Sequence, residues 1–228
     1  MSLKEVQNLV VTENTPLNAT NFLIRLVSNK PLPKFVPGQF VNVEIKNSNE
    51  IFLRRPFSVF EVNYSLNSIS LIVKVLGRGS KKLTEIKTGD SVSIIFPLGK
   101  GFTFPNPDEH ILLIGGGSGI APLLYLAKES GLNPDNVHLI LGAKSSDDHI
   151  NMENYRQFGI FFFATEDGSF GEKGFVTQHS VFQNKLKTFD KIYACGPDAM
   201  MKAIASEARK NNIFCEVSLE NLMACGFG

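Results

Sequence analysis

The 228-residue chain has no tryptophan, three cysteines and almost no net charge: 23 Lys+Arg stand against 22 Asp+Glu, a formal charge of +1. Three scattered cysteines are too few for a disulfide framework. A neutral chain whose Lys and Arg blocks never exceed two residues is a poor candidate for nucleic-acid binding. The longest apolar runs, near 111–114 and 160–164, fall far short of the roughly 18–20 residues that span a bilayer. With no secretory signal at its start, we predict a reduced, cytoplasmic protein with no nucleic-acid partner and no membrane span.

The first hundred residues are typical of an antiparallel β-barrel. Hydrophobic residues make up 43% of the chain and charged residues 20%, as in globular proteins. Short β-rich runs, such as residues 39–45 and 69–75, largely alternate between apolar and polar side chains. Turn residues such as Pro37-Gly38 and Gly89-Asp90 separate them. We predict five or six strands in a small barrel, with an immunoglobulin-like sandwich as the alternative.

The second half alternates strands and helices, which is typical of a doubly wound α/β fold with a parallel sheet. Strands are expected at 110–114, 137–141, 160–165, 191–195 and 213–219. Helices are expected from residue 120 to Gly131 and at 147–158, 177–186 and 198–210. Pro105 and Pro107 indicate a stiff connector. We therefore place one domain at 1–104, a second at 105–219 and the start of a further segment at 220–228.

A glycine loop follows the first strand of the second domain. Gly115-x-Gly117-x-Gly119 precedes an amphipathic helix, and backbone amides at such a helix start can bind a pyrophosphate. The spacing is not the usual G-x-G-x-x-G, because residue 120 is Ile. A close-packed turn between strand and helix is the alternative interpretation.

Two candidate sites lie in the first domain. Arg55-Pro56-Phe57-Ser58 offers a guanidinium suited to phosphate, an aromatic ring that can cover a planar cofactor, and a hydroxyl. Gly79-Ser80 offers unhindered amides before a short segment, 81–86, that could be helical. Structural roles, at a strand end and in a hairpin turn, are the respective alternatives.

The strand at 191–195 ends in Cys195-Gly196-Pro197-Asp198, which places the cysteine at the carboxyl edge of a parallel sheet, where ligands bind. A small buried residue at a strand end is the alternative. Asp147 and Asp148 follow the second strand of this sheet, where acidic residues favour a ribose hydroxyl over a 2′-phosphate. The positive charge of Lys144 acts against this preference, but the two acidic residues together still favour NAD over NADP. The four histidines show no metal-ligand spacing.

In this order and spacing, R-P-F-S, G-G-G-S-G-I-A-P and C-G-P-D resemble the ferredoxin–NADP reductase superfamily. More narrowly, the chain resembles the electron-transfer subunits of type B dihydroorotate dehydrogenase, over nearly all of its length. The most family-specific stretch is S-L-E-N-L-M-A-C-G at 218–226. Phe57 and Lys74 stand where that narrower family more often has an aliphatic residue and arginine, and both substitutes suit the expected roles.

The resemblance implies a role for each candidate residue. Arg55 would contact the FAD phosphates, with Pro56 beside it, Phe57 against the flavin and the Ser58 hydroxyl near flavin N5. The cofactor would be lined further by Ile72, Val73 and Lys74, and its pyrophosphate bound by Gly79 and Ser80. The NAD pyrophosphate would face Gly115, Gly116, Gly117, Ser118 and Gly119. The nicotinamide would lie beside Cys195, Gly196 and Pro197, in a site closed by Thr165, Asp167 and Gly168.

In the narrower family Cys225 begins a run of cysteines that binds a [2Fe–2S] cluster, which needs four ligands. Only three residues follow Cys225 in this sequence. Cys195 and Cys215 are expected on separate strands and are poor substitutes. We therefore expect that these 228 residues do not hold the cluster alone and that the natural chain is longer; a family member that has lost the cluster is the alternative.

The resemblance implies an FAD-dependent oxidoreductase subunit of pyrimidine biosynthesis, with hydride passing directly between nicotinamide and flavin across the cleft between the domains. Its partner would be the FMN-containing catalytic subunit that oxidises dihydroorotate, in a heterotetramer. Another NAD(P)H-dependent reductase subunit, serving ferredoxin, sulfur or hydrogenase chemistry, is the first alternative. A non-enzymatic flavin- or nucleotide-sensing module is the second, although it has no need of two hydride partners.

Overall fold

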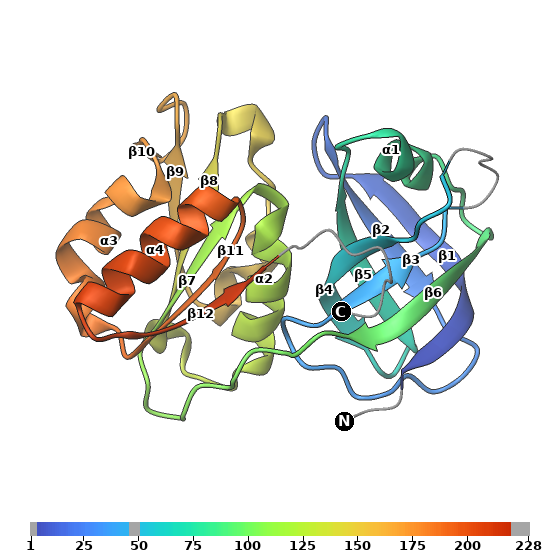
Figure 1. Ribbon diagram of the computed structural model, residues 1–228, viewed down its shortest axis with the longest axis horizontal. Coiled ribbons are helices and arrows are strands. Elements are labelled where there is room, and N and C mark those ends of the chain that lie inside the picture. Colours follow the sequence, from blue (N-terminus) through green and yellow to red (C-terminus); the bar gives the residue numbers. More distant parts are fainter. Residues whose placement is uncertain (1–3, 46–50, 220–228) are drawn as a thin grey trace. The chain divides into compact units, whose positions relative to one another are not determined.

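The computed structural model describes residues 4–45 and 51–219, and the chain divides into two compact units (Figure 1). Unit 1 ends at Phe102 and unit 2 begins at Thr103. Within the described ranges, no helix is both long enough and apolar enough to cross a membrane.

Unit 1 is a closed antiparallel barrel with strand order β1-β2-β5-β4-β3-β6. Closure excludes the sandwich and confirms the barrel prediction. Register shifts in the β1–β2, β3–β6 and β4–β5 pairs bend the strands enough to close the sheet. The strands are β1 (Glu5–Pro16), β2 (Asn21–Val27), β3 (Phe40–Val43), β4 (Arg55–Asn63), β5 (Ser68–Lys74) and β6 (Ser91–Leu98), and helix α1 (Arg78–Thr84) follows β5.

The alternating sequence pattern explains the barrel core. In β1, Leu9 and Val11 are fully buried, whereas Val6 and Val10 are exposed. Strand β5 differs, because six of its seven residues are buried, and it lies between β2 and β4. Burial of one side chain of this size contributes about 1.5–3 kcal/mol, so the barrel is a rigid support for the residues at its strand ends.

Unit 2 contains a parallel six-stranded sheet with the order β10-β9-β8-β7-β11-β12. The doubly wound prediction is therefore confirmed. The strands are β7 (Ile111–Gly116), β8 (Val137–Ala143), β9 (Ile160–Thr165), β10 (Glu172–Lys173), β11 (Lys191–Cys195) and β12 (Phe214–Ser218). The α-helices are α2 (Ile120–Glu129), α3 (Ser180–Lys185) and α4 (Asp198–Lys210).

Helices cover both faces of this sheet, which is why its strands read as continuous apolar runs. Alternate residues of β7, Leu112 and Ile114, belong to a core cluster with Phe182 of α3 and Ile204 of α4. Figure 1 shows α4 lying across that face of the strands. Helix α2 packs on the other face, since a Cβ on Gly115 would lie 2.8 Å from Ile120 Cγ2.

The structure differs from the prediction for two helices of unit 2: one is replaced by 3-10 segments, and the other is shorter than predicted. Residues 147–158 form two 3-10 segments, Ser146–Asp148 and Glu153–Phe158. The side chain of Asn151 accepts a hydrogen bond from the Glu153 N–H, and such local bonds compete with a continuous helix. In the segment 177–186 the α-helix covers only α3, between the 3-10 turns Val176–Gln178 and Leu186–Thr188. It begins there because His179 is extended (ψ 139°) and its ring caps the helix by accepting from Val181 N–H at 3.1 Å.

Strand β10, which the sequence did not indicate, is anchored to α3 by Glu172. The carboxylate accepts hydrogen bonds from the hydroxyl and the main-chain N–H of Ser180, the latter at 2.7 Å. His179 Nε2 lies 3.4 Å from the same carboxylate. These bonds keep the segment between β9 and α3 attached to the sheet.

We predict that Glu172→Gln lowers the melting temperature by a few degrees at pH 7. The Ser180 hydroxyl holds the pKa of Glu172 below its ordinary value of 4.5, with further help from Ser180 N–H and His179 against the effect of burial. A carboxyl with a lowered pKa stabilises the fold above its unfolded pKa, and the contribution is lost as the pH falls through the folded pKa. The difference from wild type should therefore shrink below pH 4.5 in thermal melts; a difference that persists there, or an equal effect of the exposed control Glu129→Gln, would contradict the assignment.

Candidate cofactor sites

In unit 1, the guanidinium of Arg55 lies against Gly79. A Cβ placed on Gly79 would lie 2.9 Å from Arg55 Nε, so this close approach requires glycine. Arg55 Nη1 donates to the carbonyl oxygens of Leu53 at 2.8 Å and Arg54 at 3.3 Å. Nη1 is the donor in both hydrogen bonds, so the N–H groups of Nε and Nη2 take no part in them. The structure thus brings together two residues predicted to bind FAD phosphates, from β4 and α1.

The neighbouring Arg54 has a different, structural task. Its Nη1 donates to the main-chain oxygen of Ser93 at 2.9 Å, and its Nη2 donates to the Ser93 hydroxyl at 2.8 Å. These bonds tie the start of β4 to β6. Adjacent arginines with similar chemistry in the sequence are therefore distinguished by their partners.

Ser80 shapes the turn between β5 and α1. Its hydroxyl accepts from the N–H groups of Leu76 at 2.9 Å and Gly77 at 3.1 Å, and donates to the Gly77 carbonyl oxygen at 3.1 Å. A hydroxyl has one donor, which is used here within the turn. Its predicted phosphate contact stays a prediction, and the observed bonds indicate that Ser80 acts by holding the loop beside Arg55.

The remaining predicted flavin residues lie on neighbouring strands. Phe57 and Ser58 of β4 are half-buried and stand opposite Val41 and Phe40 of β3. In β5, Lys74 is half-buried, whereas the side chains of Ile72 and Val73 are buried in the barrel. Pro56 is exposed. The roles of these residues toward a flavin stay predictions.

In unit 2, the strand order reverses at β7. Strands β8 and β9 lie on one side of β7, whereas β11 lies on the other, so the loops after β7 and β11 flank the reversal. Open parallel sheets bind ligands at this point, outside the carboxyl ends of the strands. The sequence placed Gly115–Gly119 and Cys195–Pro197 in these two loops, and the structure brings the loops into contact.

The contact between the loops is made by main chain. A Cβ on Gly119 would lie 2.3 Å from the carbonyl oxygen of Cys195 and 2.8 Å from Gly196 N. Gly116 lies against Pro197, to whose Cδ an added Cβ would come within 2.9 Å. Residues 117–119 form a 3-10 turn that leads directly into α2. Bare backbone at a helix start is what a pyrophosphate needs, so the loop fits the predicted nucleotide role.

Sequence reasoning missed Met200, which supports both loops from the first turn of α4. Its Sδ would lie 3.0 Å from a Cβ on Gly116, and its Cε 2.7 Å from a Cβ on Gly196. Met200 comes three residues after Pro197, and this helical spacing was the available signal. Cys195 is itself fully buried, which indicates that its main chain, more than its thiol, faces the loops.

The loop after β9 holds the other predicted residues. The Thr165 hydroxyl is buried, donates to Phe170 O at 2.8 Å and accepts from Phe170 N–H at 3.0 Å. Asp167 accepts from the hydroxyl of Ser169 at 2.6 Å, which lowers the pKa of this carboxyl together with the Ser169 N–H. Gly168 forms the turn between them with φ +80°. Their closing role over a nicotinamide stays a prediction.

This loop is tied to the one after β8, which carries the acidic pair predicted to favour NAD. Ser146 N–H donates to Ser169 Oγ at 2.7 Å, and Asp167 N–H donates to Lys144 O at 3.3 Å. Asp147 and Lys144 lie on this loop, and Asp147 is exposed. The acidic Asp147 and the basic Lys144, on which the predicted preference for NAD over NADP depends, therefore both lie on this loop.

The described residues do not fit a [2Fe–2S] cluster. Cys195 stands opposite Ser218 and Cys215 opposite Ile192 in the β11–β12 pair, so the cysteines are three residues out of register, about 10 Å along the strands. Burial raises the pKa of Cys215 to about 11, with Glu216 adding to the effect. Within residues 4–45 and 51–219, no cluster of metal-ligating side chains occurs. Cys225, the predicted metal ligand, lies outside the described residues.

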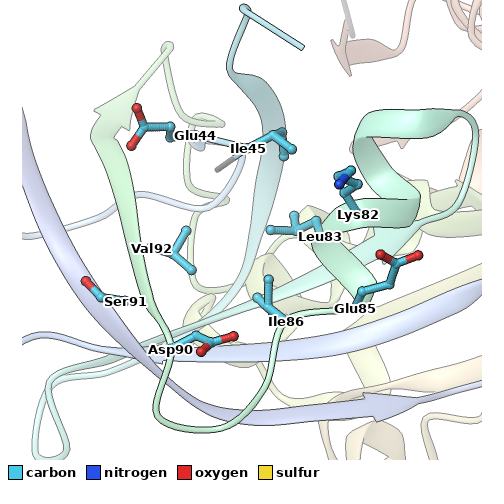
Figure 2. Close-up of a pocket in the computed structure, with 9 residues that line it drawn as sticks. All are labelled: Glu44, Ile45, Lys82, Leu83, Glu85, Ile86, Asp90, Ser91 and Val92. Atoms are coloured by element: carbon cyan, nitrogen blue, oxygen red, sulfur yellow. The ribbon is translucent and has the colours of Figure 1, made fainter. Parts of the chain in front are cut away.

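Unit 1 also contains a separate cavity of about 280 Å³. Figure 2 shows Leu83, Ile86 and Val92 directed toward one another within it, with Asp90 and Glu85 near its edge. This cavity lies at the C-terminal end of α1, and its lining includes no residue predicted to bind FAD.

Two family descriptions match this architecture. "Oxidoreductase FAD-binding domain" matches residues 7–103, and "Oxidoreductase NAD-binding domain" matches residues 113–206. The chain is thus an oxidoreductase of the class that joins an FAD-binding domain to an NAD-binding domain, with FAD and NAD(H) as cofactors. The Arg55–Gly79 cradle and the glycine contacts of unit 2 fit those two groups.

Similar proteins define the family more narrowly. The electron transfer subunit of dihydroorotate dehydrogenase B (NAD(+)) from Fusobacterium nucleatum subsp. nucleatum is 34% identical over 98% of this chain and 87% of that protein. The same subunit from Caldanaerobacter subterraneus subsp. tengcongensis is 38% identical over 84% of this chain and 73% of that protein. The chain belongs to the family of dihydroorotate dehydrogenase B electron transfer subunits.

Solved structures agree with the fold. An NADH-dependent reduced ferredoxin-NADP oxidoreductase, described in work on flavin-based electron bifurcation, has a TM-score of 0.83 and 29% identity. The match covers 96% of this chain and 79% of the other chain. The ferredoxin reductase in carbazole 1,9a-dioxygenase has a TM-score of 0.81 at 20% identity, covering 95% and 70% of the two chains, and supports the fold alone.

We predict that Arg55→Ala weakens FAD binding by about 10- to 100-fold, because hydrogen bonds to a charged group contribute roughly 1.5–3 kcal/mol. Gly79→Ala should weaken it as well, since the new methyl group displaces Arg55 Nε from its present position. Flavin fluorescence titration of the apoprotein measures both effects. Arg25→Ala, which breaks an ion pair with Glu13 elsewhere on the barrel, is the matched control. Undiminished FAD affinity in Arg55→Ala would remove this residue from the site.

We predict that Gly119→Ala destabilises unit 2 by about 1–3 kcal/mol, the usual effect of overpacking. The added methyl group meets the Cys195 main chain at 2.3 Å, and backbone cannot move aside as a flexible side chain can. Urea denaturation followed by circular dichroism measures the effect, and NAD affinity should fall with it. Gly77→Ala, where an added Cβ meets nothing within 4 Å, is the control; equal stability of Gly119→Ala and wild type would be inconsistent with this close contact.

Proposed function

We propose that this chain carries electrons between NAD and a catalytic partner subunit that contains FMN and oxidises dihydroorotate to orotate, with FAD as the intermediate carrier and a [2Fe–2S] cluster as a further carrier if the chain is longer. The observation that carries the proposal is the family match over 98% of the chain, combined with an intact cradle for each nucleotide. The names of the relatives support the substrate and the partner. A heterotetramer with that partner, acting in pyrimidine biosynthesis, follows from the same support.

In unit 1, this chain binds and orients the flavin. The Arg55 fork neutralises phosphate charge, and Gly79 leaves the space in which that fork lies. Phe57 and Ser58 of β4 would hold the flavin ring system, Phe57 through its aromatic ring and Ser58 through its hydroxyl. FAD, when bound, supplies the redox chemistry, because it exchanges two electrons with NAD and single electrons with other carriers.

In unit 2, the chain positions the nicotinamide nucleotide. Amides of residues 115–119 at the start of α2 hold the pyrophosphate, and the helix dipole favours its negative charge. The main chain of Cys195 and Gly196, with Pro197 after it, forms the edge beside the nicotinamide. No side chain acts as a general base in this scheme, because the protein contributes position and electrostatics.

The deciding experiment combines the purified FAD-loaded chain with the FMN-containing partner. Dihydroorotate and NAD⁺ are added, and formation of NADH and orotate is followed together. We expect equal amounts of both products, and only when both subunits are present. Absence of NADH, with the FAD retained and the partner active toward an artificial acceptor, would refute the proposal.

A ferredoxin-linked reductase subunit is the second candidate, favoured by the 29% identity to the NADH-dependent reduced ferredoxin-NADP oxidoreductase. The same two units would serve it with a different partner. Reduction of ferredoxin by NADH through the purified chain, with no dihydroorotate-dependent NADH formation, would favour this candidate. In both cases NADH should bleach the bound flavin rapidly, and an unresponsive flavin would indicate the sensing module instead.

We predict that Ser58→Ala retains FAD but slows its reduction by NADH roughly tenfold, because a lost transition-state hydrogen bond of about 1.4 kcal/mol changes a rate by that factor. Stopped-flow absorbance of the flavin measures the rate. Ser91→Ala, an exposed serine at the start of β6, serves as the control. An unchanged rate would exclude Ser58 from the mechanism.

A further inference from the structure

The chain passes from unit 1 to unit 2 between Phe102 and Thr103, and each of these two residues is anchored in its own unit. On the unit 1 side, Phe102 N–H donates to the Pro37 carbonyl oxygen at 2.7 Å. The Phe102 side chain is buried, and its ring lies so close to Gly38 that an added Cβ would meet it at 3.0 Å. Unit 1 therefore holds its chain up to its last residue before the connection.

On the unit 2 side, Thr103 makes three hydrogen bonds with two residues of the sheet. Its N–H donates to Glu216 Oε2 and its hydroxyl to Glu216 Oε1, both at 2.8 Å. The Tyr193 hydroxyl donates to the Thr103 carbonyl oxygen at 2.7 Å. We refer to Thr103, Tyr193 and Glu216 as the connector clamp.

The clamp is part of the sheet that carries the nucleotide loops. Tyr193 and Glu216 are direct partners in the β11–β12 register. Tyr193 is fully buried and lies two residues before Cys195, on the same face of β11. Burial raises the pKa of Tyr193, with Glu216 and Glu109 adding to the effect, which favours the protonated hydroxyl that donates to Thr103.

The rest of the connecting segment is fixed to the same strand pair. Glu109 forms an ion pair of 2.8 Å with Lys191, the first residue of β11. His110 N–H donates to Asp190 Oδ2, also at 2.8 Å. If the clamp at Thr103 were lost, the chain would next be held by the buried side chain of Pro105 and then at Glu109, so the residues directly after Phe102 would be added to the free connection.

We infer that Thr103, Tyr193 and Glu216 are positioning residues for electron transfer between the nucleotide of unit 2 and the flavin of unit 1, an inference that rests on the proposed function. They act by keeping the connection between Phe102 and the sheet as short as one peptide link. Transfer between two bound groups depends steeply on their geometry, and a displacement of about 1 Å can cost on the order of a hundredfold in rate. A longer free connection would allow the two units more relative arrangements. Few of these would permit electron transfer between the nucleotide and the flavin.

The test measures single-turnover reduction of bound FAD by NADH in stopped flow, at a series of NADH concentrations. Tyr193→Phe, Glu216→Gln and Thr103→Val each remove part of the clamp. We expect the limiting rate to fall at least tenfold, while FAD occupancy and the apparent Kd for NADH stay within twofold of wild type. Thr103→Ser keeps both donors and should restore the rate. Glu207→Gln, which removes an exposed ion pair with Lys210 on α4, is the control and should have no effect.

A second construction tests the same inference if a buried substitution prevents folding. Three glycines inserted between Phe102 and Thr103 lengthen the connection and leave every clamp residue intact. The limiting rate should again fall with Kd unchanged, whereas the same insertion in the exposed turn at Leu66 should not alter it. Wild-type rates in the insertion variant and in the folded clamp variants would overturn the inference, and so would loss of FAD or NADH binding in those variants. If NADH fails to reduce the flavin of the wild type, the proposed function fails and the inference falls with it.

Discussion

The main-chain contact between Gly119 and Cys195 is the constraint on which the nucleotide site of unit 2 depends. Two loops that follow different strands approach so closely that an added methyl group would lie 2.3 Å from a carbonyl oxygen. The approach leaves bare amide groups at the reversal of the sheet, where α2 begins. Phosphate binding at the proposed site would then need no basic side chain, because the helix start and its amides supply the positive potential.

Unit 1 meets the same need for phosphate binding differently. An antiparallel barrel offers no long helix start at a strand reversal, so a side chain must supply the charge. We propose Arg55, at the start of β4, for this role, and Gly79 provides the space in which its guanidinium lies. The loop around it is held by Ser80, whose hydroxyl is occupied within the turn. One unit thus relies on backbone and the other on an arginine supported by glycine.

Patterns that depend on neighbours in sequence were predictable, and those that depend on distant segments were not. Continuous apolar runs indicated the strands of the parallel sheet, and the order of loops led to the two proposed nucleotide sites, whose residue roles stay predictions. The helix expected over 147–158 failed because the Asn151 side chain accepts a local hydrogen bond from Glu153 N–H, a competition that apolar spacing does not reveal. The connector clamp was invisible, since Thr103, Tyr193 and Glu216 come from three separate segments with no shared spacing.

The occupied hydrogen-bond donors separate residues that shape a loop from those that can meet a ligand. The hydroxyls of Ser80 and Thr165 each donate within their own turns. The guanidinium of Arg55 has five donors, and its two main-chain bonds both leave from Nη1. Sequence motifs group such residues together, because all of them are needed for the site. Their partners show that Ser80 and Thr165 build the loops, whereas the two main-chain bonds of Arg55 leave from Nη1, so Nε and Nη2 are the donors that we propose for an anion.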